Sequence, residues 1–231
     1  MTETDVQAPP SLPRRATWAA IDWLYAAAWQ VRSLGPTTAA NYRSGTRQPV
    51  VALPGVYETW QFMRPLMDAL HERGHPIYVV TQLGHNLRTV PESARVTMDV
   101  IEREGLHDVL VLAHSKGGLI GKYAMAHLDP DGRIDRMVAI ATPFGGSSYA
   151  RFAPVRHLRA FRATDPVLAA LIREVDANRR ITSIYGVFDT MIPSGSELPG
   201  ARNVRLPVGG HFHILGDPRA REVVLETAAG D

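Results

Sequence analysis

The chain has 231 residues, of which 45% are apolar and 21% are charged, and this composition is typical of one globular domain rather than a disordered or repeat-built chain. Its formal net charge of +2 is too small to indicate an electrostatic nucleic-acid binder, so we expect no nucleic-acid partner. The absence of cysteine excludes disulfides, thiolate metal sites and a cysteine nucleophile.

The N-terminal region is predicted to be a tail followed by one helix. Residues 1–13 are polar and contain several prolines, which is typical of a flexible tail. Over residues 14–34 the apolar side chains recur at close to the helical period, which predicts an amphipathic helix, followed by a linker that ends near residue 47. Packing of the apolar stripe on the body of the domain is one interpretation, and contact with a partner or a membrane surface is the other.

No clear targeting or membrane-spanning segment is present. No stretch stays apolar for the roughly 18 to 20 residues that a membrane-spanning helix needs. The nearest candidate for a secretory signal begins at Arg14, but acidic residues precede it and Asp22 interrupts its apolar run. We therefore expect a cytoplasmic bacterial protein, with peripheral membrane contact through residues 14–34 as the alternative.

From residue 48 onward, short apolar runs alternate with helical patterns. The runs lack the in/out alternation of half-exposed strands, which indicates strands covered on both faces. This alternation predicts a three-layer α/β/α domain over residues 48–231, with a mostly parallel sheet whose ligands lie at the carboxyl ends of its strands. The expected strands are 50–53, 77–81, 109–113, 137–141, 181–185 and 204–206, and the expected helices are 59–73, 90–104, 116–128 and 218–227.

Two helix starts and one insertion complete the predicted organisation. Thr89 with Glu92 has the pattern of a capping box, and Asp217 before Pro218 marks the start of the last helix. Residues 143–180 break the alternation, because they show helical patterning without a strand run. A long insertion of this kind is typical of a lid or substrate-binding cap, and a solvated helical face is the alternative.

Ser115 carries the strongest chemical signal in the sequence. It follows an apolar strand run and precedes a glycine-rich helix pattern, in the order Ala113-His114-Ser115-Lys116-Gly117. A serine at a sharp strand-to-helix turn is held out above the edge of the sheet, and its neighbours must be small because the backbone there is crowded. The start of a helix at this point also favours developing negative charge. The pattern therefore predicts a serine hydroxyl presented at the sheet edge.

This segment resembles the nucleophile elbow Gly-x-Ser-x-Gly of the α/β-hydrolase superfamily, and the chain looks most like the small bacterial lipases and esterases. Ala113 stands where that pattern has its first glycine. The resemblance covers about residues 48–228. It implies an α/β-hydrolase fold with a short N-terminal part and a helical cap, and it implies Ser115 as the nucleophile.

The same resemblance implies an acid and a base that follow the serine in chain order. Asp189 comes after a strand run and precedes Ile192 and Pro193, which resembles the acid turn of the superfamily. His211 follows Gly210, which resembles its histidine loop. Asp189 is therefore the implied orienting acid and His211 the implied base.

His213 is a competing candidate for the base. A His-x-His pair on one strand face can also ligate a metal. However, the superfamily motif places the base directly after glycine, which fits His211 alone. Since the chain has no cysteine and no His-Glu-x-x-His pattern, we expect no metal and no cofactor.

An acyl-transfer site also needs backbone N–H groups for the oxyanion. The resemblance implies the amides of Lys116 and Val56, although Pro54 replaces the usual histidine of the loop that contains Val56. The side chain of Lys116 is expected to be a solvated helix residue. The aromatic residues that flank the motif loops are candidates for an apolar acyl pocket or for core packing, and these are Tyr57, Trp60, Phe144 and Phe212.

These residues predict a serine hydrolase, an esterase or lipase, that cleaves a small ester or lipid through an acyl-enzyme. One alternative is a non-catalytic α/β-hydrolase-like binding protein, against which the complete set of serine, acid and histidine argues. Another is an acyltransferase or thioesterase with the same triad, which fold and triad alone do not distinguish from a hydrolase.

Overall fold

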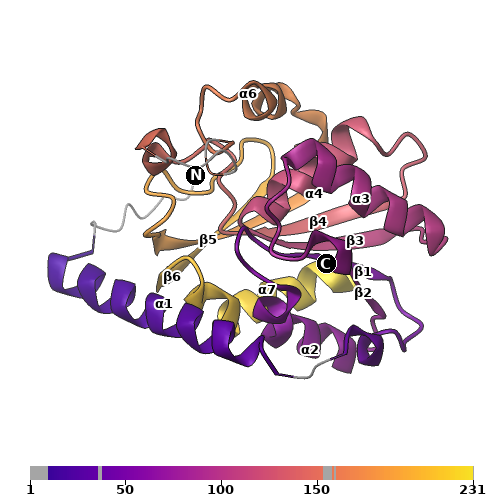
Figure 1. Ribbon diagram of the computed structural model, residues 1–231, viewed down its shortest axis with the longest axis horizontal. Coiled ribbons are helices and arrows are strands. Elements are labelled where there is room, and N and C mark those ends of the chain that lie inside the picture. The colour runs from indigo at the N-terminus through magenta and orange to yellow at the C-terminus, as the bar shows by residue number, and fades with distance from the viewer. Residues whose placement is uncertain (1–9, 36–37, 153–157, 159, 231) are drawn as a thin grey trace, which may run out of the picture.

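The computed structural model describes residues 10–35, 38–152, 158 and 160–230, and a parallel six-stranded sheet lies at the centre of these residues (Figure 1). The strand order is β2-β1-β3-β4-β5-β6, and every pair of neighbours is parallel. The strands are β1 Val50–Leu53, β2 Ile77–Val79, β3 Val109–His114, β4 Ile134–Ile140, β5 Ile181–Phe188 and β6 Arg202–Gly209.

Helices cover both faces of this sheet (Figure 1). Alternate residues of β3 enter two separate hydrophobic cores: Val109, Val111 and Ala113 on one face, Leu110 and Leu112 on the other. The predicted three-layer α/β/α arrangement is therefore confirmed. Helices α3 Val90–Arg103, α4 Lys116–His127 and α6 Pro166–Arg173 lie over one face, and α1 Leu12–Arg32, α2 Arg64–Glu72 and α7 Pro218–Ala229 lie over the other.

The boundaries differ from the predicted ones inside the sheet and at its edges. The predicted strand 137–141 begins earlier, as β4 starts at Ile134, and the predicted strand 181–185 is longer, as β5 ends at Phe188. The predicted strand 77–81 ends at residue 79, because a 3₁₀ turn, Thr81–Leu83, follows directly. The predicted strand 204–206 is too short, since β6 begins at Arg202 and carries exposed polar residues, as an edge strand can. The helix predicted over 59–73 is divided into the 3₁₀ turn Trp60–Met63 and α2, which has Pro65 in its first turn.

The two predicted helix starts are confirmed. Thr89 and Glu92 form both bonds of a capping box at the start of α3. Asp217 accepts the amide N–H of Arg219 at the start of α7, with Pro218 as the first helical residue. Each cap fixes the residue at which a helix begins and thereby the end of the loop before it. These loops connect strands to helices above the carboxyl edge of the sheet.

The N-terminal helix α1 lies along the domain and contacts β6 (Figure 1). It begins at Leu12, so the last two residues of the predicted tail belong to the helix, whereas residues 1–9 lie outside the described part. The predicted linker contains a 3₁₀ turn, Ala39–Tyr42, whose Tyr42 is buried in the core. Within the described residues, no helix combines the length and the apolar character needed to span a bilayer.

The segment 143–180 forms short helical elements in its described part. A 3₁₀ turn, Ser148–Phe152, precedes α6, and a second 3₁₀ turn, Asp176–Arg180, leads into β5. Residues 153–157 and 159 of the predicted cap lie outside the described part. The described residues of this segment add no strand, as the sequence predicts.

Candidate active site

Ser115 occupies the sharp turn between β3 and α4, with φ 51° and ψ −119°. This left-handed conformation is unfavourable for a residue with a side chain, and the surrounding contacts hold it in place. A Cβ on Gly117 would lie 2.0 Å from the carbonyl oxygen of Leu53, and one on Gly118 would lie 2.1 Å from Oγ1 of Thr142. The two glycines are therefore required, because α4 starts in direct contact with the neighbouring strands.

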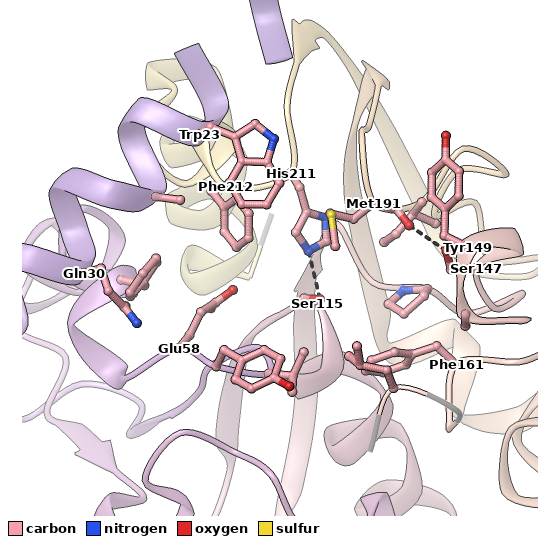
Figure 2. Close-up of a pocket in the computed structure, with 18 of the residues that line it drawn as sticks. Trp23, Gln30, Glu58, Ser115, Ser147, Tyr149, Phe161, Met191, His211 and Phe212 are labelled. Atoms are coloured by element: carbon pink, nitrogen blue, oxygen red, sulfur yellow. Dashed lines mark hydrogen bonds between the residues drawn. The ribbon is translucent and has the colours of Figure 1, made fainter. Parts of the chain in front are cut away.

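His211 lies within hydrogen-bond distance of the other two residues that the resemblance implies, Ser115 and Asp189. Nε2 of His211 is 2.9 Å from Oγ of Ser115 (Figure 2), and Nδ1 of His211 is 2.9 Å from Oδ2 of Asp189. The other carboxylate oxygen of Asp189 accepts the amide N–H groups of Met191 and Ile192. These residues follow β3, β5 and β6, whose carboxyl ends meet at one edge of the sheet.

The competing candidate, His213, does not reach Ser115. Its ring packs edge-on against Tyr25 of α1, with 5.7 Å between the ring centroids. Its amide N–H donates to Asp22. In the described part of the chain, no group of three or more His, Asp or Glu side chains is arranged to hold a metal ion.

Burial and charge act in opposite directions on the His211–Asp189 pair. Burial raises the pKa of Asp189, but the His211 imidazolium and the two amide donors outweigh it and hold this pKa below its ordinary value. Burial lowers the pKa of His211, but the Asp189 carboxylate outweighs it and raises this pKa above its ordinary value, with smaller contributions from Glu58 and Asp22. The pair therefore favours an imidazolium next to a carboxylate, which is the state that a general base reaches after taking a proton.

The two residues whose amides are implied for an oxyanion hole border the site of Ser115. Val56 lines the cavity above the serine, and Lys116 is the first residue of α4. Among the residues that the structure describes, neither amide N–H donates to a protein acceptor. The loop that contains Val56 is held by Glu58, whose Oε2 accepts the amide N–H of Gly55 at 2.9 Å. Two free N–H groups beside a helix N-terminus are suited to a developing negative charge.

The expectation that the side chain of Lys116 is solvated is wrong. This side chain is completely buried, and its ammonium donates to the carbonyl oxygens of Asn86 (2.6 Å) and Arg88. Burial lowers the pKa of Lys116 to about 8, against the opposing effect of the Glu92 carboxylate. The lysine thus joins α4 to the loop before α3, because carbonyl groups of that loop face the start of α4.

A cavity of about 590 Å³ opens above Ser115, and most of its lining is apolar (Figure 2). Tyr57 and Phe212 line it, as the sequence suggests. Trp60 and Phe144 are absent from its described lining: Trp60 packs edge-on against Tyr42, and Phe144 is buried in the core. The lining residues are Trp23, Ala26, Ala27, Gln30, Val56, Tyr57, Glu58, Phe62, Ser115, Pro143, Ser147, Tyr149, Ala150, Leu158, Phe161, Met191, Ile192, His211 and Phe212.

Comparison with known proteins identifies the architecture. No protein-family model matches the chain. The mature form of the lipase BlEst2 from Bacillus licheniformis superimposes with a TM-score of 0.62 at 14% identity, over 84% of this chain and 94% of that one. The chain has the α/β-hydrolase fold.

Two further solved structures share this α/β-hydrolase fold. One belongs to the metagenome-derived lipolytic enzymes LipS and LipT, with a TM-score of 0.59 at 15% identity, over 82% of this chain and 95% of that one. The other is the hydrolase olei00960 from Oleispira antarctica, with a TM-score of 0.55 at 14% identity, over 82% and 96%. The fold expected from the elbow motif is thus confirmed.

Three polar residues that no sequence motif marked as site residues lie next to Ser115, Asp189 and His211. They are Asp22 on α1, Glu58 after the loop of Val56, and His114 in the elbow. Each had a signal in the sequence. Asp22 is a lone acid in an apolar helix, and the other two lie within or next to the recognised motifs. Burial of all three, visible only in the structure, distinguishes them from surface residues.

Proposed function

We propose that this protein is a serine hydrolase that cleaves carboxylic esters with an apolar acyl group. The observation that supports this most directly is the continuous path of hydrogen bonds from Asp189 through His211 to Ser115, which ends under an apolar cavity. A serine hydroxyl becomes an effective nucleophile when a base lies within hydrogen-bond distance and a third group orients that base.

In the proposed reaction, Oγ of Ser115 attacks the ester carbonyl carbon while Nε2 of His211 takes the hydroxyl proton. The carbonyl electron pair moves to the oxygen, which accepts hydrogen bonds from the amides of Val56 and Lys116. The bond to the alcohol oxygen then breaks, and the alcohol leaves with the proton from His211. A water molecule, deprotonated by the same nitrogen, attacks the acyl-Ser115 ester, and the acid is released.

The cavity supports an apolar acyl group. Its lining contains few polar atoms, and a pocket of this type stabilises a ligand chiefly by removing apolar surface from water. Glu58 adds a carboxyl group to this wall, beside the serine (Figure 2). An anionic acyl group would lose its hydration in this site of low polarity, and the carboxyl of Glu58 is already paired with His114, so we expect neutral substrates to be preferred.

A fluorophosphonate probe tests the proposal directly. The wild-type protein should be labelled and should hydrolyse nitrophenyl esters, whereas Ser115→Ala should lose both properties with an unchanged circular dichroism spectrum. Ser44→Ala, at an exposed serine outside the cavity lining, is the control and should behave as wild type. Turnover retained by Ser115→Ala, or a wild-type protein that neither labels nor turns over, would overturn the proposal; the second result would favour a binding protein.

A panel of nitrophenyl esters from acetyl to palmitoyl, with and without lipid droplets, refines the substrate class. A preference for short soluble esters defines an esterase, and higher activity on long esters with droplets defines a lipase. Adding a primary alcohol or a thiol as competing acceptor measures transfer. We expect water to be the main acceptor, and acyl transfer in excess of hydrolysis would contradict the hydrolase assignment.

A further inference from the structure

Asp22 is a fully buried acid on α1 that binds the segment carrying His211. Its Oδ2 accepts the amide N–H of His211 at 2.9 Å, and its Oδ1 accepts the amides of Phe212 (2.7 Å) and His213 (2.8 Å). The hydroxyl of Thr190, next to Asp189, donates to Oδ2 at 3.3 Å. One carboxylate thus binds three consecutive backbone amides of the histidine loop.

The loop is shaped to receive this carboxylate. Successive N–H groups in a turn converge and form a concavity that favours an anion. Gly210 has φ 119°, and a Cβ at this position would lie 2.6 Å from Oδ1 of Asp22. A Cβ on Gly209 would lie 2.3 Å from the ring of Trp18, so both glycines allow α1 to approach. In the described ranges no arginine or lysine pairs with Asp22, and both of its oxygens accept hydrogen bonds.

The carbonyl group of His211 is also held by a hydrogen bond. Nε2 of His114 lies 3.0 Å from the carbonyl oxygen of His211 and donates to it. The main chain of His211 is therefore fixed at its N–H by Asp22 and at its carbonyl by His114. Its imidazole must bond Ser115 and Asp189 at the same time, so the position of this main chain decides whether both bonds form.

We propose that Asp22 is the positioning residue for the base of the active site, which makes α1 a part of that site rather than an N-terminal addition to it. The expected effect on turnover rests on the proposed function, whereas the effect on His211 itself does not.

The negative charge of Asp22 affects the pKa of His211, and this pKa can be measured. A purely structural role of Asp22 would leave it unchanged. Three carboxyl groups face His211 from separate elements, those of Asp189, Glu58 and Asp22, and the ring of His114 lies beside it. Removing one negative charge makes the imidazolium less favourable, which lowers the pKa of His211. The acid limb of kcat/KM, which reports the free base, then moves to lower pH.

The test is Asp22→Asn, with Asp129→Asn as a matched control. Asp129 also accepts two backbone amides, those of Arg133 and Ile134, at the start of β4 and far from the site. An asparagine keeps the shape, but its NH₂ group cannot accept the amides. We expect Asp22→Asn to lower kcat by about 10- to 100-fold with little change in KM. The acid limb should move to lower pH, while Asp129→Asn lowers only Tm.

Asp22→Glu separates charge from geometry. It retains the negative charge but displaces it by one methylene, so kcat should fall while the acid limb stays in place. NMR titration of His211 measures its pKa without turnover and therefore distinguishes failure of this proposal from failure of the proposed function. Equal kcat and equal His211 pKa in wild type and Asp22→Asn would show that Asp22 has only a structural role.

A separate observation concerns the outer face of α1, which is exposed and apolar. Between Arg15 and Arg32 the only charged residue is Asp22, which is buried. Leu24 and Val31 have 70% and 69% of their surface exposed. Apolar patches of this kind on a protein surface commonly mark interaction sites. The large exposed apolar residues of this helix are Leu12, Ile21, Trp23, Leu24 and Val31.

This face is continuous with the mouth of the cavity. Trp23 and Gln30 of α1 line the cavity (Figure 2), and Trp23 is also largely exposed. Across the cavity, Tyr57, Tyr149 and Met191 are lining residues that remain partly exposed. An apolar rim therefore surrounds the route by which an apolar substrate would enter.

We infer that α1 and this rim dock on a phospholipid surface that carries anionic headgroups. A helix that lies in such an interface needs an uncharged apolar face at the acyl boundary and cations that reach the headgroups. Helix α1 meets both conditions, because its outer face is uncharged and the exposed Arg14 and Arg32 stand near its two ends. Binding of a protein partner would not explain why this face carries no charge along its length, nor why its ends are cationic.

Sedimentation of the full-length protein with phosphatidylcholine vesicles, with and without phosphatidylglycerol, tests this inference without turnover. The wild type should bind, and more strongly to the anionic vesicles. Leu24→Glu with Val31→Glu should weaken binding by about tenfold or more and leave hydrolysis of a water-soluble ester unchanged. The control pair is Ile172→Glu with Val175→Glu, at exposed apolar positions in and just after α6.

Three outcomes would overturn the inference. One is a wild type that does not sediment with the vesicles, and another is equal loss of binding in both variant pairs. The third is a concentration-dependent dimer in analytical ultracentrifugation that the Leu24 and Val31 changes abolish, because a second copy of the chain would then cover this face.

Discussion

Nδ1 of His114 lies 2.8 Å from Oε2 of Glu58, and the two side chains are buried, with 0% and 3% of their surface exposed. The other ring nitrogen of His114 faces the carbonyl oxygen of His211, which only accepts, so this nitrogen carries a proton. A second proton must lie between Nδ1 and Oε2. The pair is therefore an imidazolium with a carboxylate or an imidazole with a carboxylic acid, and it is neutral overall in both forms.

This pair predicts that Glu58→Gln lowers the free energy of unfolding and kcat/KM, although glutamine and glutamate are almost equal in size. A single oxygen of Glu58 binds both His114 and the Gly55 amide. In Glu58→Gln an NH₂ group at that position leaves the Gly55 amide unpaired, whereas an amide oxygen pairs with both only if His114 remains a buried imidazolium without a counter-charge. Leaving a buried polar group unpaired costs about 1 to 3 kcal/mol of unfolding free energy. Urea unfolding should measure this loss, together with a fall in kcat/KM caused by displacement of the loop that carries Val56.

The matched control for this prediction is Glu226→Gln. Glu226 pairs with Arg202 on the surface, with about half of each side chain exposed, so the loss should stay below about 1 kcal/mol. An unchanged unfolding free energy in Glu58→Gln would contradict the proton assignment of the buried pair.

The elements, and the meeting of Ser115, His211 and Asp189 at one edge of the sheet, were predictable because their signals are local. Strands covered on both faces produce continuous apolar runs, as in β1 and β3, whose residues are all buried. The elbow serine depends on small residues within three positions of it, and these are visible in any sequence. The parallel topology then brings three strand ends to one edge, so residues far apart in the chain meet without further information.

The residues around the triad were not predictable in the same way, because their partners are distant in sequence. Lys116 at a helix start looks like a solvated residue, and only the loop carbonyls of Asn86 and Arg88 explain its burial. Asp22 contacts amides almost 190 positions later. In the sequence it merely interrupts an apolar run, whereas in the fold it is the buried residue of its helix.

Asp189→Asn tests the role of the acid in orienting the base. An asparagine presents an NH₂ group or an uncharged oxygen to Nδ1 of His211, which favours the wrong tautomer and removes the charge that stabilises the imidazolium. In serine proteases the corresponding change lowers kcat about 10⁴-fold, and we expect a loss of similar size with nitrophenyl esters. Asp165→Asn is the control, because Asp165 binds amides two and three positions later with the same geometry but outside the site. A change of less than tenfold in Asp189→Asn would mean, on the same protease precedent, that another acid serves His211.

Gly117→Ala tests the contact that shapes the elbow. Its Cβ would lie 2.0 Å from the backbone oxygen of Leu53, which cannot move without displacing β1 and the loop after it. Overpacking of this kind costs about 1 to 3 kcal/mol or more, so Tm and kcat should both fall. Gly145→Ala is the control, since no atom lies within 4 Å of its added Cβ, and its effect should stay within about 0.5 kcal/mol. Equal thermal stability in the two variants would show that the start of α4 adapts.

The His211–Asp189 pair predicts that stability and activity change in opposite directions with pH. The pKa of His211 is raised by Asp189, so its contribution to stability is complete below the ordinary histidine pKa of about 6.5 and is lost as pH rises through the folded value. The pKa of Asp189 is lowered, so its contribution is present above about pH 4 and is lost only as pH falls through the folded value. Both contributions are therefore complete between about pH 4 and 6.5.

The proposed hydrolysis requires the opposite protonation state of the same imidazole, because an imidazolium cannot take the proton of Ser115. We therefore expect the wild type to be inactive where the ion pair is strongest. The free energy of unfolding lost in His211→Gln should be larger at about pH 5.5 than at about pH 9, while kcat/KM of the wild type rises over the same range. Chemical unfolding at the two pH values gives the first quantity and nitrophenyl ester hydrolysis the second.

The control is the effect of His211→Gln on the free energy of unfolding in an Asp189→Asn background. This effect should show little pH dependence, since the partner charge is gone. A pH dependence that survives this background would mean that Glu58 or Asp22, rather than Asp189, stabilises the imidazolium.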